Sequence, residues 1–119
     1  MIIIRSEQMD AFKASAMNDF EVELSEHLKS FEPALCRAAG DDAIRYAVRV
    51  GCERARGYGL STRGSLSFYL ELMTVFGSDF DTDPQLYWAG DTLRDDSLKN
   101  EVERTSWLYD RMTDYLDEV

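Results

Sequence analysis

The stretch SLSFYLELMTVFG, residues 65–77, decides the fold of this chain. Its polar residues between positions 66 and 76 are Ser67, Glu71 and Thr74. Steps of four and three place these side chains on one narrow stripe of an otherwise apolar helix, whereas a strand would need them to alternate. A helix that is apolar on most of its surface needs other helices to cover it. We therefore predict a central, largely apolar helix over about residues 62–77.

Helical patterns also fill the sequence before this stretch. Apolar residues recur at steps of three or four from the candidate N-cap Ser6 to Leu28, which predicts one long amphipathic helix. Pro33 suits the first turn of a short helix that continues through Ala39, and Gly40 suits the end of that helix. Two helices are therefore expected before residue 41.

A third helix follows, with Asp41 and Asp42 as its capping residues, and runs out at the sequence GYG, residues 57–59. Its expected core face consists of Ile44, Ala47, Val48, Gly51 and Ala55.

Two more helices are expected after residue 77. Asp83 can cap and Pro84 can open a helix that runs to about Asp95. Asn100, with Glu103 three residues later, resembles the capping box of a last helix. The core face predicted for this helix consists of Val102, Leu108, Met112, Tyr115 and Leu116. The sequence thus predicts an all-α fold, a compact single-domain bundle of five to six helices over residues 1–119.

Composition agrees with one domain that folds around its own core. The chain has 119 residues, of which 45% are apolar, which suffices for a single core. The opening MIII is too short for a signal peptide or a spanning helix, so we expect a cytoplasmic protein. Cys36 and Cys52 lie in helical sequence without a disulfide pattern, and we expect both thiols to be reduced.

The charge is distributed unevenly along the chain. Residues 1–40 carry a net charge of −3, residues 41–77 carry +1, and residues 78–119 carry −8. Nucleic acids and anionic membranes bind through basic surface, so neither is an expected partner. The acidic last third is typical either of a solvated surface or of a site for a basic protein.

The sequence FGSDFDTDPQLYW, residues 76–88, places Asp79, Asp81 and Asp83 at alternate positions. A calcium loop that began at Asp79 would need glycine at its sixth position and glutamate at its twelfth, where this chain has Pro84 and Gly90. The motif of haloacid-dehalogenase-like phosphatases would need Thr or Val in place of Asp83, and a strand before it. We therefore expect a structural loop and no metal.

The structural interpretation gives each residue of this loop a role. Gly77 ends the central helix, Phe80 packs inward, and Asp83 caps the helix that Pro84 opens. Asp79 and Asp81 accept hydrogen bonds from loop amides or pair with an arginine.

Residues with catalytic chemistry are sparse. The one histidine, His27, lies within a predicted helix, and we expect it to be an ordinary surface residue. Neither cysteine has a CxxC neighbour, and the glycines at positions 57, 59 and 64 lack a P-loop lysine. No nucleophile elbow occurs, and the carboxylate pairs lie on polar stretches where their pKa values would stay ordinary. We expect a protein that is not an enzyme and needs no cofactor.

Two groups of residues are candidates for protein binding. Arg45, Arg49 and Arg56 recur at helical steps and form a basic stripe, whose preferred interpretation is an internal bridge to an acidic helix or to the aspartate loop. Trp107 lies off the predicted core face of the last helix, between Arg104 and Arg111, which can stack on it. A half-exposed tryptophan beside arginines is typical of an interface hot spot, although it can also cover the core.

Three stretches carry a resemblance to a known family: MIIIRSEQMDAF, ERARGYGLSTRGSLSFYLELM and FGSDFDTDPQLYWA. They resemble small acidic helical bacterial proteins encoded in type VI secretion gene clusters, beside PAAR-type or Rhs-type effectors and their adaptor chaperones. The resemblance implies a co-chaperone role and gives the aspartate loop no catalytic function. The residues characteristic of the family are Gly57, Gly59, Tyr69, Gly77, Phe80, Asp81, Asp83 and Pro84.

Three functions compete at this point. The resemblance favours an accessory protein that binds an adaptor chaperone, its secreted effector or both in the cytoplasm. The acidic surface would also suit an immunity protein that neutralises a cognate basic toxin. An enzyme or a calcium-regulated switch built on the aspartate loop is the least favoured.

Overall fold

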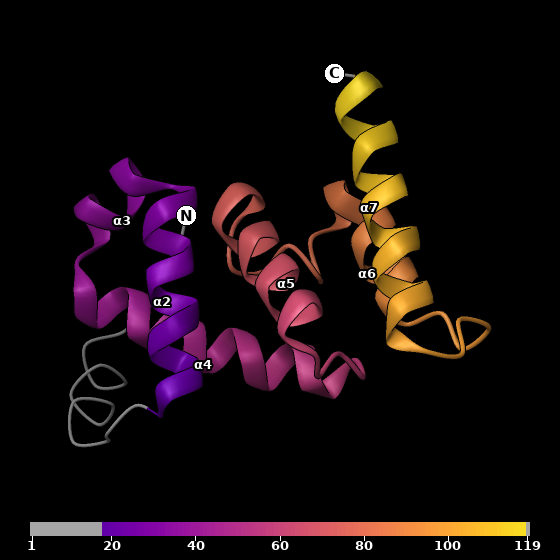
Figure 1. Cartoon of the computed structure of the whole chain (residues 1–119). Helices are drawn as coiled ribbons and strands as arrows, with labels where there is room; N and C mark the ends of the chain where they lie inside the picture. The colour runs from indigo at the N-terminus through magenta and orange to yellow at the C-terminus, as the bar shows by residue number, and fades with distance from the viewer. Residues whose placement is uncertain (1–17, 119) are drawn as a thin grey trace.

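A computed structural model describes residues 18–118, and this part of the chain contains helices and no strand (Figure 1). The helices are α2 (Asp19–Phe31), α3 (Pro33–Ala39), α4 (Asp41–Gly57), α5 (Arg63–Phe76), the 3-10 helix η1 (Pro84–Leu86), α6 (Tyr87–Leu93) and α7 (Glu101–Glu118). The predicted all-α bundle is confirmed.

The central helix predicted from the sequence is α5, which packs against α2, α4 and α7. The Thr62 side chain caps its start by accepting a hydrogen bond from the Ser65 amide, and Gly77 ends it with a φ of 104°. The predicted polar stripe is wrong at one position. Thr74 is buried, and its hydroxyl is satisfied inside the fold by donating to the carbonyl of Leu70, 2.9 Å away in the previous turn. Val75 is exposed beside it.

The prediction of one long first helix is wrong, because α2 begins at Asp19. Asn18 has an extended backbone, and its side chain accepts a 2.8 Å hydrogen bond from the Glu21 amide. The Glu21 carboxylate in turn accepts a 3.1 Å hydrogen bond from the Asn18 amide, which completes a capping box. The expectations for MIII and for Ser6 concern residues 1–17, outside the described residues.

The next two helices match their predictions closely. Pro33 and Gly40 bound α3 as expected, and every residue of the predicted core face of α4 is buried. Asp41 and Asp42 lie in the first turn of α4 but do not cap it, since the N-cap is Gly40. Gly51 lets α4 approach α5 closely, because a Cβ there would lie 2.4 Å from Cδ2 of Leu70.

The C-terminal helices differ more from prediction. The helix expected to reach about Asp95 is split into η1 and α6, which ends at Leu93. Asn100 accepts a hydrogen bond from the Glu103 amide at the start of α7, as expected. The core face predicted for α7 is wrong at Val102 and Leu116, whose side chains are 73% and 46% exposed. The α7 helix lies at one side of the molecule against α5 and α6, so a narrower face is buried.

The helices form two groups on either side of α5 (Figure 1). On one side α2, α3 and α4 pack together, with α4 running across the ends of α2 and α5; on the other side α6 packs on α7. His27 is exposed, as expected, and its Nε2 atom lies 2.9 Å from the Glu71 carboxylate, which joins α2 to α5. None of the helices in the described range has the length and apolar character needed to cross a bilayer.

Candidate functional site

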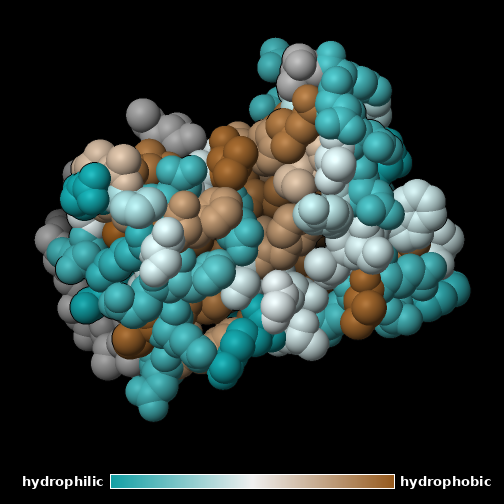
Figure 2. Space-filling view, turned by 45° about the horizontal axis from the view of Figure 1, so that its top comes forward, coloured by the Kyte–Doolittle hydropathy of each residue, from teal (hydrophilic) through white to brown (hydrophobic). Residues whose placement is uncertain are grey.

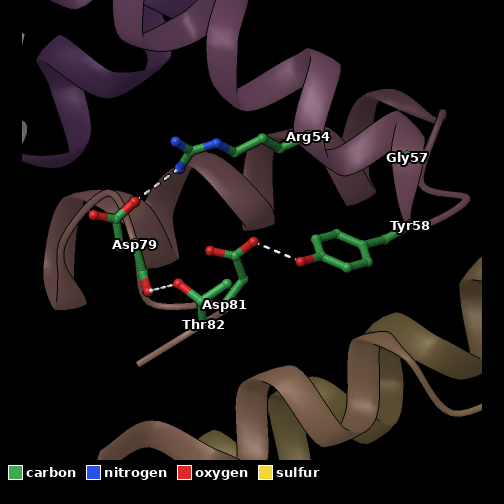
Figure 3. Close-up of a pocket in the computed structure, with 6 residues that line it drawn as sticks. All are labelled: Arg54, Gly57, Tyr58, Asp79, Asp81 and Thr82. Atoms are coloured by element: carbon green, nitrogen blue, oxygen red, sulfur yellow. Dashed lines mark hydrogen bonds and ion pairs between the residues drawn. The ribbon is translucent and has the colours of Figure 1, made fainter. Parts of the chain in front are cut away.

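The three carboxylates of the aspartate loop have three different partners, and Figure 3 shows those of Asp79 and Asp81. Asp79 pairs with Arg54 at 3.5 Å, Asp81 accepts a 2.6 Å hydrogen bond from the Tyr58 hydroxyl, and Asp83 accepts a 2.9 Å hydrogen bond from the Gln85 amide. Within residues 18–118, no three His, Cys, Asp or Glu side chains come close enough together to hold a metal ion. Each contact is of the kind that fixes a loop.

Burial of Phe80 holds the loop against the core. Its side chain is 1% exposed, and its ring centroid lies 5.0 Å from that of Tyr69 on α5. The inward position of Phe80 was predicted correctly. The predicted arginine partner of Asp79 is Arg54, which also donates to the carbonyl of Ser78. Arg54 is not part of the basic stripe identified in the sequence.

Asp81 occupies the centre of a network that the sequence did not indicate. Arg94 donates to the carbonyl of Asp81 and to the hydroxyl of Tyr58, both at 3.1 Å, and its guanidinium lies over the Tyr58 ring. Gly90 allows the loop to lie directly on α6, because a Cβ there would be 2.7 Å from the carbonyl oxygen of Asp81. The network therefore joins the end of α4, the loop and α6.

The phenols around Asp81 stay protonated. Burial raises the pKa of Tyr58, and the negative Asp81 raises it further. Burial, followed by the charge of Asp81, likewise raises the pKa of Tyr69, whose hydroxyl has no hydrogen-bond partner among the described residues. An open hollow of about 340 Å³ lies here, lined by Arg54, Gly57, Tyr58, Asp79, Asp81 and Thr82. Its charged side chains are already paired with groups of the protein, which favours a structural role.

The basic stripe on α4 does not act as one unit. Arg49 makes two hydrogen bonds, of 2.8 and 3.0 Å, to the carboxylate of Glu21 on α2. These bonds lower the pKa of Glu21, whose side chain is nearly buried. Arg49 is thus the internal bridge that was preferred from the sequence, while Arg45 and Arg56 lie exposed on the helix surface.

On α7 the two arginines beside Trp107 lie in different environments. Trp107 is 50% exposed. Arg104 points away from the position in which it would stack on Trp107, because its guanidinium donates to the carbonyls of Tyr58, Leu98 and Asp95 at 2.6, 2.9 and 3.2 Å. Arg111 and Trp107 line an open hollow of about 410 Å³ with Thr92, Asp95, Ser97, Leu98 and Glu103.

A group of apolar residues lies on the other side of α7 and was missed from the sequence. We call it the α5–α7 surface; its residues are Phe68, Val75, Tyr109, Met112 and Leu116. The rings of Phe68 and Tyr109 lie 6.0 Å apart and join the two helices. Figure 2 shows apolar atoms gathered in the hollow between the middle of the molecule and α7. The seven-residue spacing of Phe68 and Val75 and of Tyr109 and Leu116 was the signal that could have indicated it.

Comparison with known protein families, with curated proteins and with solved structures found no match to this chain. The functional argument therefore depends on the side chains described above.

Proposed function

We propose that this protein is a non-enzymatic protein-binding accessory factor. The observation that carries the proposal is the α5–α7 surface, on which Val75, Tyr109 and Leu116 are 53%, 55% and 46% exposed. Large apolar side chains that are exposed singly are ordinary, but three of them on two helices that pack together are the kind of group found at interaction sites. By comparison, the carboxylates of the aspartate loop already have partners within the protein, which favours a protein-binding function over a catalytic one.

The charge of the chain limits the class of partner. The net charge is −10, and residues 78–119, which include α7, carry −8 of it. Such a field repels nucleic acids and anionic membranes and attracts basic protein surfaces. A protein partner with basic residues beside its apolar contacts fits both properties.

The cellular role follows from the resemblance to small acidic proteins of type VI secretion clusters. On that basis the partner is an adaptor chaperone, its secreted effector or the complex of the two, and the protein acts in the cytoplasm as a co-chaperone. The acidic last third also suits an immunity protein that neutralises a cognate toxin, which is the second candidate function.

Affinity capture of the tagged protein from its native host, followed by mass spectrometry, tests this proposal. Recovery of an adaptor chaperone together with an effector is the expected result. Recovery of a toxin domain alone, together with protection of cells that express the toxin, would replace the co-chaperone role with the immunity role. Capture of neither class would contradict the proposed function.

A further inference from the structure

We propose that the α5–α7 surface is the docking site for one amphipathic helix of a partner protein, with basic residues flanking the apolar face of that helix. This inference rests on the proposed protein-binding function and specifies where and by what chemistry the partner binds.

The spacing of the apolar residues of this surface, of which Phe68 is partly buried and Val75, Tyr109 and Leu116 are exposed, fits a helix. Phe68 and Val75 are seven residues apart on α5, and Tyr109 and Leu116 are seven residues apart on α7. Seven-residue spacing keeps side chains on one side of a helix over successive turns, which is how two helices present a seam to a third helix. Met112 lies between the α7 pair and is half-buried, so it forms part of the floor.

Aromatic rings pack together next to the surface. Phe76 packs edge-on against Trp88 and Tyr115, with ring centroids 5.4 and 6.2 Å apart, and Tyr115 also packs against Trp88 at 5.7 Å. This aromatic cluster connects α5, α6 and α7, and two of its residues, Phe76 and Tyr115, are the sequence neighbours of Val75 and Leu116. A preformed surface of this kind loses little conformational freedom when a ligand binds.

The acidic residues of α7 indicate the charge of the partner. Asp110 and Asp117 each follow a residue of the α5–α7 surface in sequence, which places them about 100° further round α7, on its exposed side. The last turn contains no basic residue and carries Asp117 and Glu118, at the helix end where the dipole disfavours negative charge. Local helix stability therefore does not account for these carboxylates, whereas lysines and arginines of a bound helix would.

The same charges argue against a second copy of this chain as the occupant. Two molecules facing each other across the α5–α7 surface would bring two acidic α7 helices together, and each molecule carries a net charge of −10. Like-charge juxtaposition of this kind disfavours association. A basic heterologous helix is the occupant that fits both the apolar residues of the surface and the negative charge of α7.

A designed peptide tests the chemistry directly. The probe is a fluorescent peptide of about three heptads with leucine at positions a and d and lysine at exposed positions, and binding is measured by fluorescence anisotropy. We expect it to bind the full-length protein, and we expect Val75→Lys and Leu116→Lys each to weaken binding about tenfold or more. Both positions are exposed, so both variants should remain folded.

Matched controls separate the apolar seam from general attraction between a basic peptide and an acidic protein. Val22 on α2 is 44% exposed and lies five residues from His27, on a different side of the helix from the α5 contact. Val22→Lys makes the same change of charge and should leave binding unchanged. A peptide of the same composition with its leucines scrambled should bind at least tenfold more weakly.

Several outcomes would overturn the inference. These are failure of the amphipathic peptide to bind, equal binding of the scrambled peptide, or equal effects of Val22→Lys and Leu116→Lys. A dimer seen by sedimentation equilibrium and lost in Leu116→Lys would assign the surface to a second copy instead. If the Leu116→Lys protein still captures the chaperone and effector from the host, the docking site is wrong and the proposed function stands.

Discussion

The hydroxyl of Tyr58 donates a 2.6 Å hydrogen bond to Oδ2 of Asp81, although the two residues are 23 positions apart in sequence. Tyr58 directly follows α4, and Asp81 lies in the loop between α5 and η1. Arg94, which follows α6, contacts both residues. The bond therefore lies where α4, the aspartate loop and α6 meet.

Replacement of Asp81 by Ala should destabilise the fold. The carboxylate is nearly buried and accepts the hydrogen bond of the Tyr58 hydroxyl. Its removal takes this acceptor away, which typically lowers the free energy of unfolding by about 1–3 kcal/mol. Thermal unfolding followed by circular dichroism should show a melting temperature lowered by roughly 3–6 °C per kcal/mol. Asp79→Ala is the control: its side chain is 72% exposed, so the loss should stay below about 0.5 kcal/mol. An unchanged melting temperature in Asp81→Ala, with loss of partner capture, would move the loop from a structural role to the interface.

Loss of Arg49 should be more harmful than loss of Arg45. In Arg49→Met the nearly buried Glu21 carboxylate loses two hydrogen bonds from a guanidinium, which should cost roughly 2 kcal/mol. Arg45 is exposed, so Arg45→Met should change the free energy of unfolding by less than about 0.5 kcal/mol. Urea denaturation of the two variants measures the difference. Equal stabilities would contradict the internal bridge.

Two glycines of α4 should respond to alanine in opposite directions. At Gly51 the new methyl group would meet Leu70 at 2.4 Å and the sulfur of Met73 at 2.7 Å, so Gly51→Ala should destabilise the protein by about 1–3 kcal/mol through overpacking. At Gly57 nothing lies within 4 Å of the new Cβ, so Gly57→Ala should stabilise by about 0.5–1 kcal/mol. Chemical denaturation distinguishes the signs, and a neutral Gly51→Ala would mean that the side chains of Leu70 and Met73 can rearrange around the new methyl group without cost.

The carboxylate of Glu101 should make stability depend on acid. It accepts hydrogen bonds from the amides of Thr62 and Ser61 and from the Ser61 hydroxyl, which lower its pKa from the ordinary 4.5 to about 2. Because the folded pKa is lower than the unfolded one, this stabilisation is complete above pH 4.5 and is lost as the pH falls toward 2. The difference in melting temperature between the wild type and Glu101→Gln should therefore shrink between pH 5 and pH 2. A difference that stays constant over this range would contradict the role of the charge.

Features of the fold that are encoded locally could be predicted from the sequence. The boundaries of α3 depend on Pro33 and Gly40, and those of α5 on Thr62 and Gly77, which are properties of a few neighbouring residues. The start of α2 was also encoded locally, in Asn18 and Glu21. It was missed because apolar residues continue at helical spacing across the cap.

Features that depend on distant neighbours could not be predicted. Val102 and Leu116 have the same apolar character as Leu108, and only the position of α7 at one side of the molecule leaves the first two exposed. The partner of Asp81 is a tyrosine far away in sequence, and the partners of Arg104 are backbone carbonyls of two other segments. No periodicity in a single sequence identifies such pairs.

The central position of α5 has a consequence for hydrogen exchange. In the described part of the chain, α5 is the one helix that packs both on the α2–α4 group and on the α6–α7 pair. When the α6–α7 pair opens, α2, α3 and α4 stay packed on α5. When α5 itself unfolds, both the α2–α4 group and the α6–α7 pair lose the helix against which they pack. The amides of Leu70 and Leu72, both about 1% exposed, should therefore exchange with deuterium only through global unfolding. The amides of α7 should exchange through a smaller, local opening. A partner helix bound to the α5–α7 surface would suppress that opening.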